Sequence, residues 1–265
     1  MRYGIFSDVH SNLEALRAVI DAYQREHIDR YLCIGDIVGY AANPLECIQL
    51  IKGLNAGIVA GNHDWGSSGK FDLEYFNPSA KEALVWTSGI LSGSDKDFLC
   101  GLPLTHEEEN FVLAHGSLDR PQEFRYLNNH EAAFADFAVL KKQICFIGHT
   151  HRPGVFVELE DNLFYGVGKY KTFLTTENRL KVIAQRFSCK ASGILQLEGR
   201  KRYIVNVGSV GQPRDRDPRA VYVIYDTDAK TVELKRIAYD FKITQKKILR
   251  AGLPEFLARR LSEGR

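Results

Sequence analysis

The sequence predicts an α/β fold, and three observations lead to this prediction. In residues 1–151, short apolar runs alternate with helical patterns, which is typical of strands covered on both faces by helices. From residue 152 onward the segments are β-rich and are separated by turn-forming residues. No linker-like or low-complexity stretch divides the chain. We therefore expect a single domain over 1–265, with a βα half (1–151), a β-rich half (152–240) and C-terminal helices (241–265).

The first half contains five predicted strands separated by helices. Residues Leu13, Leu16 and Val19 recur at helical spacing, and Ser11, three residues before Glu14, suggests a capping box for this first helix. The strands are expected at 2–8, 30–36, 56–64, 110–116 and 143–151, and the helices at 13–27, 44–52, 78–102 (split at 88–94) and 130–140.

The second half is predicted to be mostly strands, which we expect to form a largely antiparallel sheet packed against the first. A short helix closes the chain at residues 253–261. The strands are expected at 155–160, 170–176, 180–187, 193–198, 202–209, 220–226 and 231–237.

Composition narrows the functional classes. The 265 residues carry 35 basic and 33 acidic side chains, so the net charge of +2 gives no general attraction to polyanions, and a nucleic-acid partner is not expected. No stretch reaches the roughly 20 apolar residues of a membrane span. Five cysteines, an odd number without a CxxC motif, indicate a reduced, cytoplasmic protein. A homo-oligomer is compatible with these features.

Each predicted strand of the first half ends in side chains that bind metals. Side chains at i and i+2 of an extended chain point the same way, so the sequence predicts two same-side pairs, Asp8 with His10 and His149 with His151, each closing on one ion. Nearby glycines allow close approach of the chain. Ligands of open α/β sheets collect at this end of the strands. The side chains are Asp8, His10, Asp36, Asn62, His63, His115, His149 and His151.

This set has too many mixed nitrogen and oxygen ligands for one tetrahedral zinc. It suits two ions that share a carboxylate, and Asp36 is the natural bridge because it is the lone carboxylate of its strand. Two divalent ions roughly 3.5–4 Å apart serve in-line displacement at phosphorus, where one generates hydroxide and both neutralise the transition state. Manganese is the metal we expect first, and iron, nickel and zinc suit the same ligands.

Five motifs carry a resemblance to a known family. DVH (8–10), GDIVGY (35–40), GNHD (61–64), AHG (114–116) and GHTH (148–151) resemble, in order and spacing, the blocks of the calcineurin-like metallophosphoesterase superfamily. Residues 205–226 and 251–261 resemble its bacterial branch of diadenosine-tetraphosphatase-like proteins and small phosphodiesterases. The resemblance implies a four-layer αββα sandwich of two mixed sheets flanked by helices.

The resemblance also implies a role for each motif residue. His63 would not be a ligand but would stabilise the transferred phosphoryl group or protonate the leaving oxygen. Asp64 would either orient that imidazole or cap the following turn. Asp36 would bridge the ions, with Asp8, His10 and His151 on the first ion and Asn62, His115 and His149 on the second.

The substrate is less well defined by the motifs. Phosphoserine/threonine phosphatases of this superfamily carry an arginine after the bridging aspartate, and this chain has Val38-Gly39-Tyr40 there instead, so phosphoprotein phosphatase activity is not expected. Arg214 would supply a substitute phosphate clamp or, alternatively, pair with Asp215 or Asp217. Tyr40 and Asn43 are candidates for the substrate entrance, and a purely structural tyrosine is the other interpretation of Tyr40.

Three functional hypotheses follow. The first is a metal-dependent hydrolase of small phosphate esters or anhydrides, with dinucleoside polyphosphates or nucleotides as the expected substrates. The second is a phosphodiesterase acting on cyclic nucleotides or other diesters, which the motifs alone do not separate from the first. The third is a non-catalytic scaffold, which the presence of His63 and the complete ligand set disfavours.

Overall fold

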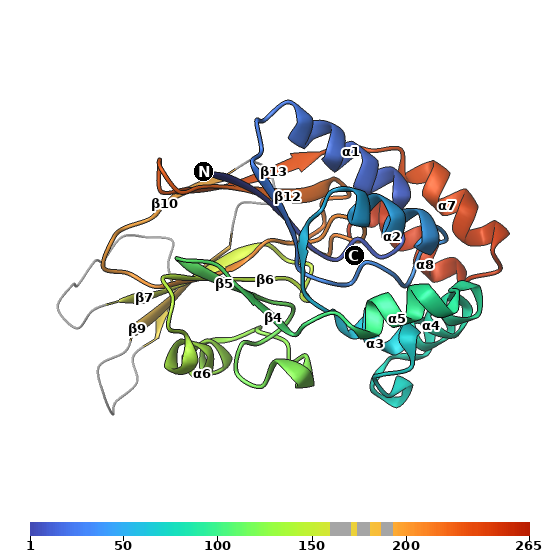
Figure 1. The fold of residues 1–265 in the computed structure, drawn as a ribbon, viewed down its shortest axis with the longest axis horizontal. Coiled ribbons are helices and arrows are strands. Elements are labelled where there is room, and N and C mark those ends of the chain that lie inside the picture. The colour runs from blue at the N-terminus through green and yellow to red at the C-terminus, as the bar shows by residue number, and fades with distance from the viewer. Residues whose placement is uncertain (160–170, 174–180, 187–192) are drawn as a thin grey trace.

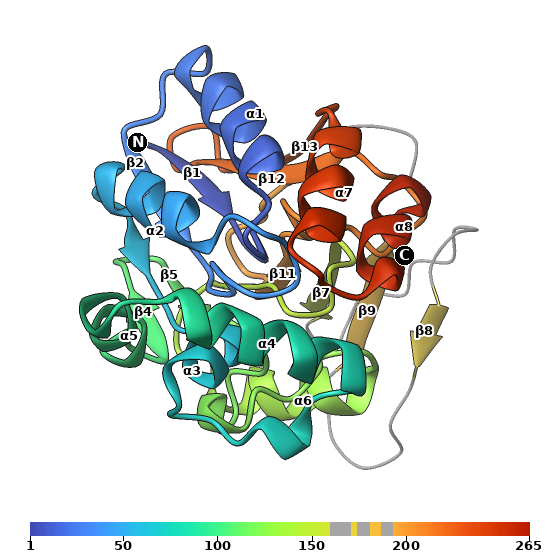
Figure 2. The ribbon, with the colours of Figure 1, turned by 90° about the vertical axis from the view of Figure 1, so that its right-hand side faces the viewer.

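The fold consists of two mixed β-sheets packed face to face with helices on their outer surfaces (Figures 1 and 2). The structure, a computed structural model, describes residues 1–159, 171–173, 181–186 and 193–265. The α/β sandwich of two mixed sheets expected from the sequence is confirmed. Within the described part of the chain, no helix combines the length and apolar character needed to cross a bilayer.

The first sheet has six strands in the order β10-β13-β12-β1-β2-β3. Strand β1 lies at its centre, parallel to β2 and antiparallel to β12. The strands span Arg2–Phe6 (β1), Arg30–Cys33 (β2), Gly57–Ile58 (β3), Gly193–Gln196 (β10), Ala220–Asp226 (β12) and Thr231–Ile237 (β13).

The second sheet has seven strands in the order β4-β5-β6-β11-β7-β9-β8. Strands β5, β6 and β11 run parallel to one another, and β7 is antiparallel to β11. The strands span Thr105–Glu107 (β4), Phe111–Ala114 (β5), Ile144–Ile147 (β6), Gly154–Leu159 (β7), Lys171–Phe173 (β8), Lys181–Arg186 (β9) and Tyr203–Asn206 (β11).

The strands after residue 152 do not form a sheet of their own, so that expectation was wrong. They pair antiparallel with one another, as expected, but β10, β12 and β13 complete the first sheet whereas β7, β8, β9 and β11 complete the second. Hydrophobic periodicity identifies a strand without identifying its partner, and that limit explains the error. Parts of the expected strands at 155–160, 170–176 and 180–187 lie outside the described residues.

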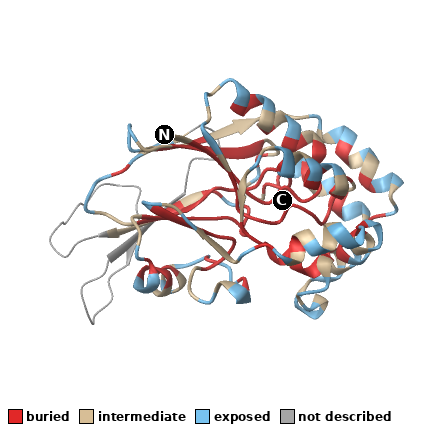
Figure 3. Cartoon of the chain, viewed as in Figure 1, coloured by how far each residue is buried: buried red, intermediate tan, exposed pale blue. Residues whose placement is uncertain are grey.

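Three apolar layers hold the sandwich together. Alternation along β1 sends Ile5 into the layer between the two sheets and Phe6 into the layer beneath helices α1 (Leu13–Gln24) and α2 (Pro44–Gly53). On the opposite surface, α6 (His130–Val139) covers the second sheet through Phe137. The central strands β1 and β12 of the first sheet and β5, β6 and β11 of the second are almost entirely buried (Figure 3).

The remaining helices gather at one end of the sandwich, on the right-hand side of Figure 1. α3 packs on α4 and α5, and α8 packs on α7, which also contacts α1. Their bounds are Asn62–Ser68 (α3), Pro78–Ile90 (α4), Gly93–Cys100 (α5), Phe241–Arg250 (α7) and Glu255–Glu263 (α8), and short 3₁₀ turns lie at Leu73–Tyr75 and Pro121–Glu123.

Two local predictions need correction. The strand expected at 56–64 is only two residues long, because the chain turns at Gly61 and begins α3 at Asn62. The first helix is capped by Asn12, whose side chain accepts a hydrogen bond from Ala15 N, rather than by Ser11. Ser11 instead has a left-handed backbone, with a φ of 56°, inside the buried loop after β1.

Candidate metal centre

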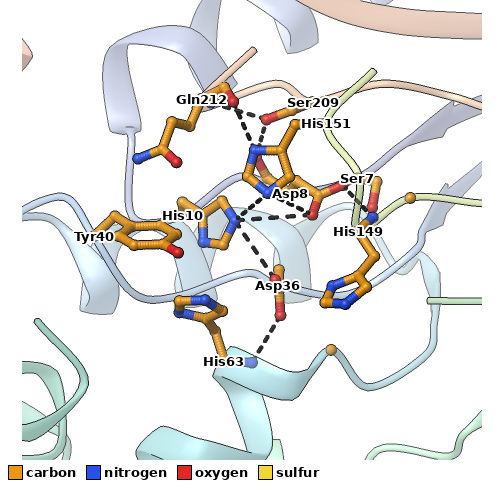
Figure 4. Close-up of polar contacts among 12 residues, drawn as sticks. Ser7, Asp8, His10, Asp36, Tyr40, His63, His149, His151, Ser209 and Gln212 are labelled. Carbon is orange, nitrogen blue, oxygen red and sulfur yellow. Dashed lines mark hydrogen bonds and ion pairs between the residues drawn. The ribbon is translucent and has the colours of Figure 1, made fainter. Parts of the chain in front are cut away.

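The loops that follow β1, β2, β5 and β6 converge at one end of the two sheets (Figure 1). The side chains of these loops point toward one another, as Figure 4 shows for Asp8, His10, Asp36 and His151. All the predicted ligand residues on these loops are buried, with at most 4% of their surface exposed. Titratable groups in such number are buried at low cost only when they have a common partner.

The potential ligand atoms form two groups that share one residue, Asp36. Asp8, His10, Asp36 and His151 offer atoms within 4.8 Å of one another, and Asp36, His115 and His149 form the second group. In the first group, Nε2 of His10 lies 3.5 Å from Asp36 Oδ2 and 3.1 Å from His151 Nε2.

The second group has the same spacing. His115 Nε2 lies 3.2 Å from Asp36 Oδ2 and 3.1 Å from His149 Nδ1. One carboxylate oxygen, Asp36 Oδ2, therefore lies within 3.5 Å of an imidazole nitrogen from each group. This is the geometry that a carboxylate bridge between two ions requires.

The pairing of His149 with His151 on one ion was wrong, and the backbone gives the reason. The prediction assumed an extended chain, but His149 and His151 have φ values of 64° and 57°, so the alternation of side chains does not hold. His151 joins the group of Asp8, and His149 joins the group of His115. Asp8, His10 and Asp36 are also left-handed, and such strain, about 1–3 kcal/mol at each residue, is typical of functional sites.

Three imidazoles are oriented by main-chain carbonyls. Nδ1 of His10 lies 3.2 Å from Val38 O, Nδ1 of His115 lies 2.7 Å from Ile34 O, and Nδ1 of His151 lies 2.6 Å from Gln212 O. A carbonyl only accepts, so each Nδ1 carries a proton. In the neutral rings of His10 and His151, Nε2 therefore presents a lone pair to the group, and Nε2 of His115 does so once that ring has lost its second proton. Second-sphere hydrogen bonds of this kind fix the tautomer of metal-binding histidines.

In Asp8 and Asp36, one carboxylate oxygen faces the ligand group and the other accepts a hydrogen bond from the backbone. Asp36 Oδ1 accepts from His63 N at 2.9 Å, and Asp8 Oδ2 accepts from His149 N at 3.0 Å. Asp8 Oδ1 and Asn62 Oδ1 are buried without a hydrogen-bond partner among the described residues. Buried oxygens without partners beside inward-facing imidazole lone pairs fit divalent cations well.

Burial and mutual charge set the pKa values of the group. Burial lowers the pKa of His10, His149 and His151 well below the usual value, which keeps these imidazoles neutral. Burial also lowers the pKa of His115, but the adjacent Asp36 carboxylate outweighs this and raises it to about 9.

The two carboxyls of the first group respond in opposite directions. Burial raises the pKa of Asp8 to about 7. Burial acts in the same direction on Asp36, but the charge of His115 outweighs it and holds the pKa of Asp36 well below the usual range. The protein without metal therefore keeps Asp36 ionised against a protonated His115.

His63 lies in the first turn of α3, not at the end of a strand, and its ring faces the first group. Its centroid is 4.7 Å from that of His10 and 4.5 Å from that of Tyr40, and its buried Nδ1 has no hydrogen-bond partner among the described residues. Burial lowers its pKa to about 4.

Asp64 does not orient the His63 ring but anchors the backbone. Its carboxylate accepts hydrogen bonds from Ile37 N (2.9 Å), Val38 N (3.3 Å) and Gly61 N (3.0 Å). These bonds cap the start of α3 and hold the loop that carries Asp36. Of the two roles weighed for Asp64, its contacts are those of the cap.

The three substrate-binding candidates lie in different surroundings. Arg214 donates to Gln212 Oε1 at 2.9 Å and lies 3.4 Å from Tyr40 Oη, whereas Asp215 and Asp217 pair with other arginines, so the alternative loop salt bridge is not formed. Tyr40 packs against His10, with ring centroids 4.6 Å apart. Asn43 is engaged elsewhere, donating to Glu46 Oε1 and accepting from Lys247 Nζ, so its contacts are structural.

Close approach at the centre depends on a glycine. A Cβ at Gly61 would lie 2.0 Å from Asp36 Oδ1 and 2.3 Å from Asp36 N, which excludes any side chain there. The expectation that glycines permit close approach is thereby confirmed at this position.

Two residues beside the centre were not predicted from the sequence. The ring of Tyr126 stacks on His149 with centroids 3.9 Å apart, and Arg260 of α8 lies against Tyr40. Neither belongs to a motif at a strand end. Arg260 lies in the segment 251–261, which resembles the bacterial branch of diadenosine-tetraphosphatase-like proteins. This resemblance was the one feature of the sequence that pointed to a role for Arg260.

Comparison with known proteins is consistent with this geometry. Residues 1–230 match the family described as Calcineurin-like phosphoesterase superfamily domain. The chain is 37% identical to the uncharacterized protein MJ0912 of Methanocaldococcus jannaschii over 98% of this chain and 97% of that one. It is also similar to the crystal structure of a metallophosphoesterase from Sphaerobacter thermophilus, with a TM-score of 0.81 and 34% identity, covering 100% of this chain and 99% of that chain.

A more distant relative carries an activity in its name. Phosphodiesterase MJ0936 of Methanocaldococcus jannaschii is 26% identical over 179 residues, which cover 66% of this chain and 87% of the relative. The aligned length is shorter than the family match, and the identity is lower than for the two relatives above.

Proposed function

The chain belongs to the calcineurin-like phosphoesterase superfamily and is a metal-dependent phosphoesterase, and we propose that it hydrolyses small phosphate esters or anhydrides at a centre of two divalent ions. Dinucleoside polyphosphates or nucleotides are the substrates we propose first. The observation that carries this proposal is the position of Asp36, whose Oδ2 faces His10 on one side and His115 on the other.

Each ion would be held by one of the two groups. When bound, two divalent ions activate water for attack and neutralise the charge that develops at phosphorus. Asp36 would be shared, with Asp8, His10 and His151 completing the first position and His115, His149 and Asn62 completing the second. The buried, partnerless oxygens of Asp8 and Asn62 support this division.

His63 is proposed to act on the phosphoryl group and the leaving oxygen. Its main-chain N–H is held by Asp36, so the ring has a fixed position beside the first group. Because burial lowers the pKa of His63 to about 4, the imidazole is neutral near pH 7 and has one ring N–H to donate to a bound phosphoryl group. A phosphate anion against the ring would raise this pKa, which favours protonation of the ring when substrate is present.

Arg214 is proposed as the clamp for the phosphoryl oxygens. Its partners Gln212 and Tyr40 are neutral, so its guanidinium charge is not cancelled by a carboxylate at these contacts. A planar guanidinium matches two phosphate oxygens. Tyr40 holds the plane of the guanidinium through its hydroxyl and ring.

A phosphodiesterase is the second candidate function. It is favoured by the similarity to a relative named as a phosphodiesterase. A centre with two ions and an arginine clamp accepts either a monoester or a diester, and the difference depends on the groups at the rim. A non-catalytic scaffold is disfavoured because His63 and the ligand groups are in place.

The metal and the location follow from chemistry. Mixed imidazole and carboxylate ligands suit manganese, which we propose as the resident metal, with iron, nickel or zinc as alternatives. The cysteines of the described residues, Cys33, Cys47, Cys100 and Cys145, are free thiols. Free thiols are the rule in a reducing compartment, which supports a cytoplasmic location.

A substrate panel tests the proposal. Dinucleotides, nucleotides, cyclic nucleotides and phosphopeptides would each be assayed with manganese, nickel, iron and zinc. We expect metal-dependent release of phosphate or nucleotide from dinucleoside polyphosphates or nucleotides and little from phosphopeptides. Turnover of cyclic nucleotides alone would favour the phosphodiesterase instead, and no turnover with any metal would contradict both.

A further inference from the structure

Two arginines from distant parts of the chain lie against the same tyrosine beside the candidate centre. The guanidinium carbons of Arg214 and Arg260 lie 5.8 and 6.0 Å from the ring centroid of Tyr40. Tyr40 in turn packs against His10 (Figure 4). The arginine pair is therefore one aromatic ring away from the first ligand group.

No aspartate or glutamate side chain neutralises the charge of this pair. The acidic neighbours of Arg214 are engaged elsewhere, because Asp215 pairs with Arg236 and Asp217 with Arg219. Within the described parts of the chain, neither Arg214 nor Arg260 forms an ion pair with an aspartate or glutamate side chain. Arg214 Nε is buried without a hydrogen-bond partner, and Arg260 Nε donates to the main-chain oxygen of Arg265.

The two guanidinium groups also act on one another. Burial, and after it the positive charge of Arg214, lowers the pKa of Arg260 to about 10. Two like charges held together in a half-buried place destabilise the fold. Such an arrangement is typical of a site that binds an anion, because the anion relieves the repulsion.

A cavity lies beside Arg214, and Arg260 is not among the residues that line it. It has a volume of about 190 Å³ and is lined by Tyr126, Asn128, Thr150, Arg152 and Arg214. Thr150 lies between two candidate ligands in the chain, and Tyr126 stacks on one of them. The space beside the centre is thus bordered by cationic and aromatic groups, which suits a substrate larger than a single phosphate.

Resting on the function proposed above, we propose that Arg260 binds a second phosphate group of the substrate, beside the phosphoryl group that Arg214 clamps. This contact makes the enzyme prefer substrates with two or more phosphates over monoesters whose leaving group is uncharged. A guanidinium binds phosphate oxygens through charge-assisted hydrogen bonds, which are stronger than neutral ones. Arg260 lies in α8, beyond the residues 1–230 that match the family, so the general family pattern does not supply this residue.

Binding of two non-hydrolysable probes tests the inference. Adenosine 5′-(α,β-methylene)diphosphate and the corresponding adenosine monophosphonate differ in one phosphate group. Their dissociation constants for manganese-loaded protein would be measured by calorimetry. We expect the protein to bind the diphosphate analogue about 10- to 100-fold more tightly, the range expected for hydrogen bonds to a charged group.

Three variants assign the preference to Arg260. Arg260→Gln should bring the ratio of the two dissociation constants to within about threefold of unity, and Arg260→Lys, which keeps the charge without the fork, should give an intermediate ratio. Arg259→Gln is the matched control, because Arg259 is the exposed neighbour on the same helix, and it should keep the original ratio. Equal affinity of the unaltered protein for the two probes, or an unchanged ratio in Arg260→Gln, would overturn the inference.

Thermal unfolding without ligand separates binding from packing. Removal of a charge that repels Arg214 should leave the melting temperature of Arg260→Gln equal to or above that of the unaltered protein. A lower melting temperature with the probe ratio preserved would show that Arg260 only packs α8, and would overturn the inference.

Hydrolysis of p-nitrophenyl phosphate and bis(p-nitrophenyl) phosphate, measured alongside, reports on the proposed function alone. Hydrolysis together with equal probe affinities would leave the function supported and the second phosphate site refuted. If the unaltered protein prefers the diphosphate analogue but hydrolyses neither ester, the second phosphate site is supported and the proposed function is refuted.

Discussion

Replacement of Asp36 by asparagine should release both metal ions together. Asp36 Oδ2 is the atom shared by the two groups, 3.5 Å from His10 Nε2 and 3.2 Å from His115 Nε2. An asparagine that keeps its one oxygen for the hydrogen bond from His63 N places an NH₂ group, which has no free lone pair for a metal, where the charged bridge was. The loop should therefore keep its shape while both metal positions lose a charged ligand.

The size of the effect follows from the burial of the site. Asp36 is 1% exposed, so solvent does not compensate for the lost charge. Removal of one partner from a buried charged pair costs about 3–5 kcal/mol, and each 1.36 kcal/mol is a factor of ten, so each ion should bind about 10²- to 10⁴-fold more weakly. Metal titration of the apoprotein and metal analysis after dialysis measure this loss.

The controls make the outcome decisive. Asp21→Asn, an exposed aspartate of α1, should retain two ions with unaltered affinity. If Asp36→Asn still holds two ions tightly, the bridge assignment is wrong. If it loses one ion and keeps the other at full affinity, Asp36 is a ligand to one position only.

The remaining predictions concern the general acid, the glycine contact and the proton balance. His63→Ala should keep its metal and lose about 10²- to 10⁴-fold in turnover, because a positioned acid–base group contributes that much, and unaltered turnover would remove His63 from the mechanism. Gly61→Ala should lower metal affinity and melting temperature, because its Cβ would lie 2.0 Å from Asp36 Oδ1. The control Gly89→Ala, with open space around it in α4, should raise the melting temperature slightly. Equal effects of the two substitutions would contradict the contact between Gly61 and Asp36. Asp36 raises the pKa of His115 to about 9, and this imidazole must lose its proton to bind an ion. Metal affinity should therefore rise between pH 6 and pH 9 with release of protons, which calorimetry in buffers of different ionisation enthalpy measures. A pH-independent affinity would contradict the protonated state of His115.

The succession of strands along residues 1–151 and the convergence of their ends could be predicted, because both depend on the local pattern of apolar and polar residues. Apolar runs that stop at Asp8, Asp36, His115 and His149 identify buried strands whose ends share one edge, and the structure places all four in the two groups. Hydrophobic periodicity was less informative about the second half, because it identifies an apolar strand such as β12 without indicating which of the two sheets the strand joins. β12 pairs with β13, which follows it in the chain, and with β1, more than 200 residues away.

The division of the ligands between the groups could not be derived from spacing. His149 and His151 separate because each has a left-handed backbone, a conformation that is uncommon outside glycine and that the spacing of the two residues does not reveal. Arg260 and Tyr126 were missed for a related reason, since they reach the centre through the packing of α8 and of the loop before α6. Residues brought in by such packing have no periodic signal in the sequence.

Anomalous diffraction from crystals grown with manganese tests the central claim most directly. The account predicts two peaks per chain, about 3.5–4 Å apart, on either side of the Asp36 carboxylate. One peak should contact Asp8, His10 and His151, and the other should contact Asn62, His115 and His149. A single peak, or two peaks that do not share Asp36, would contradict the account.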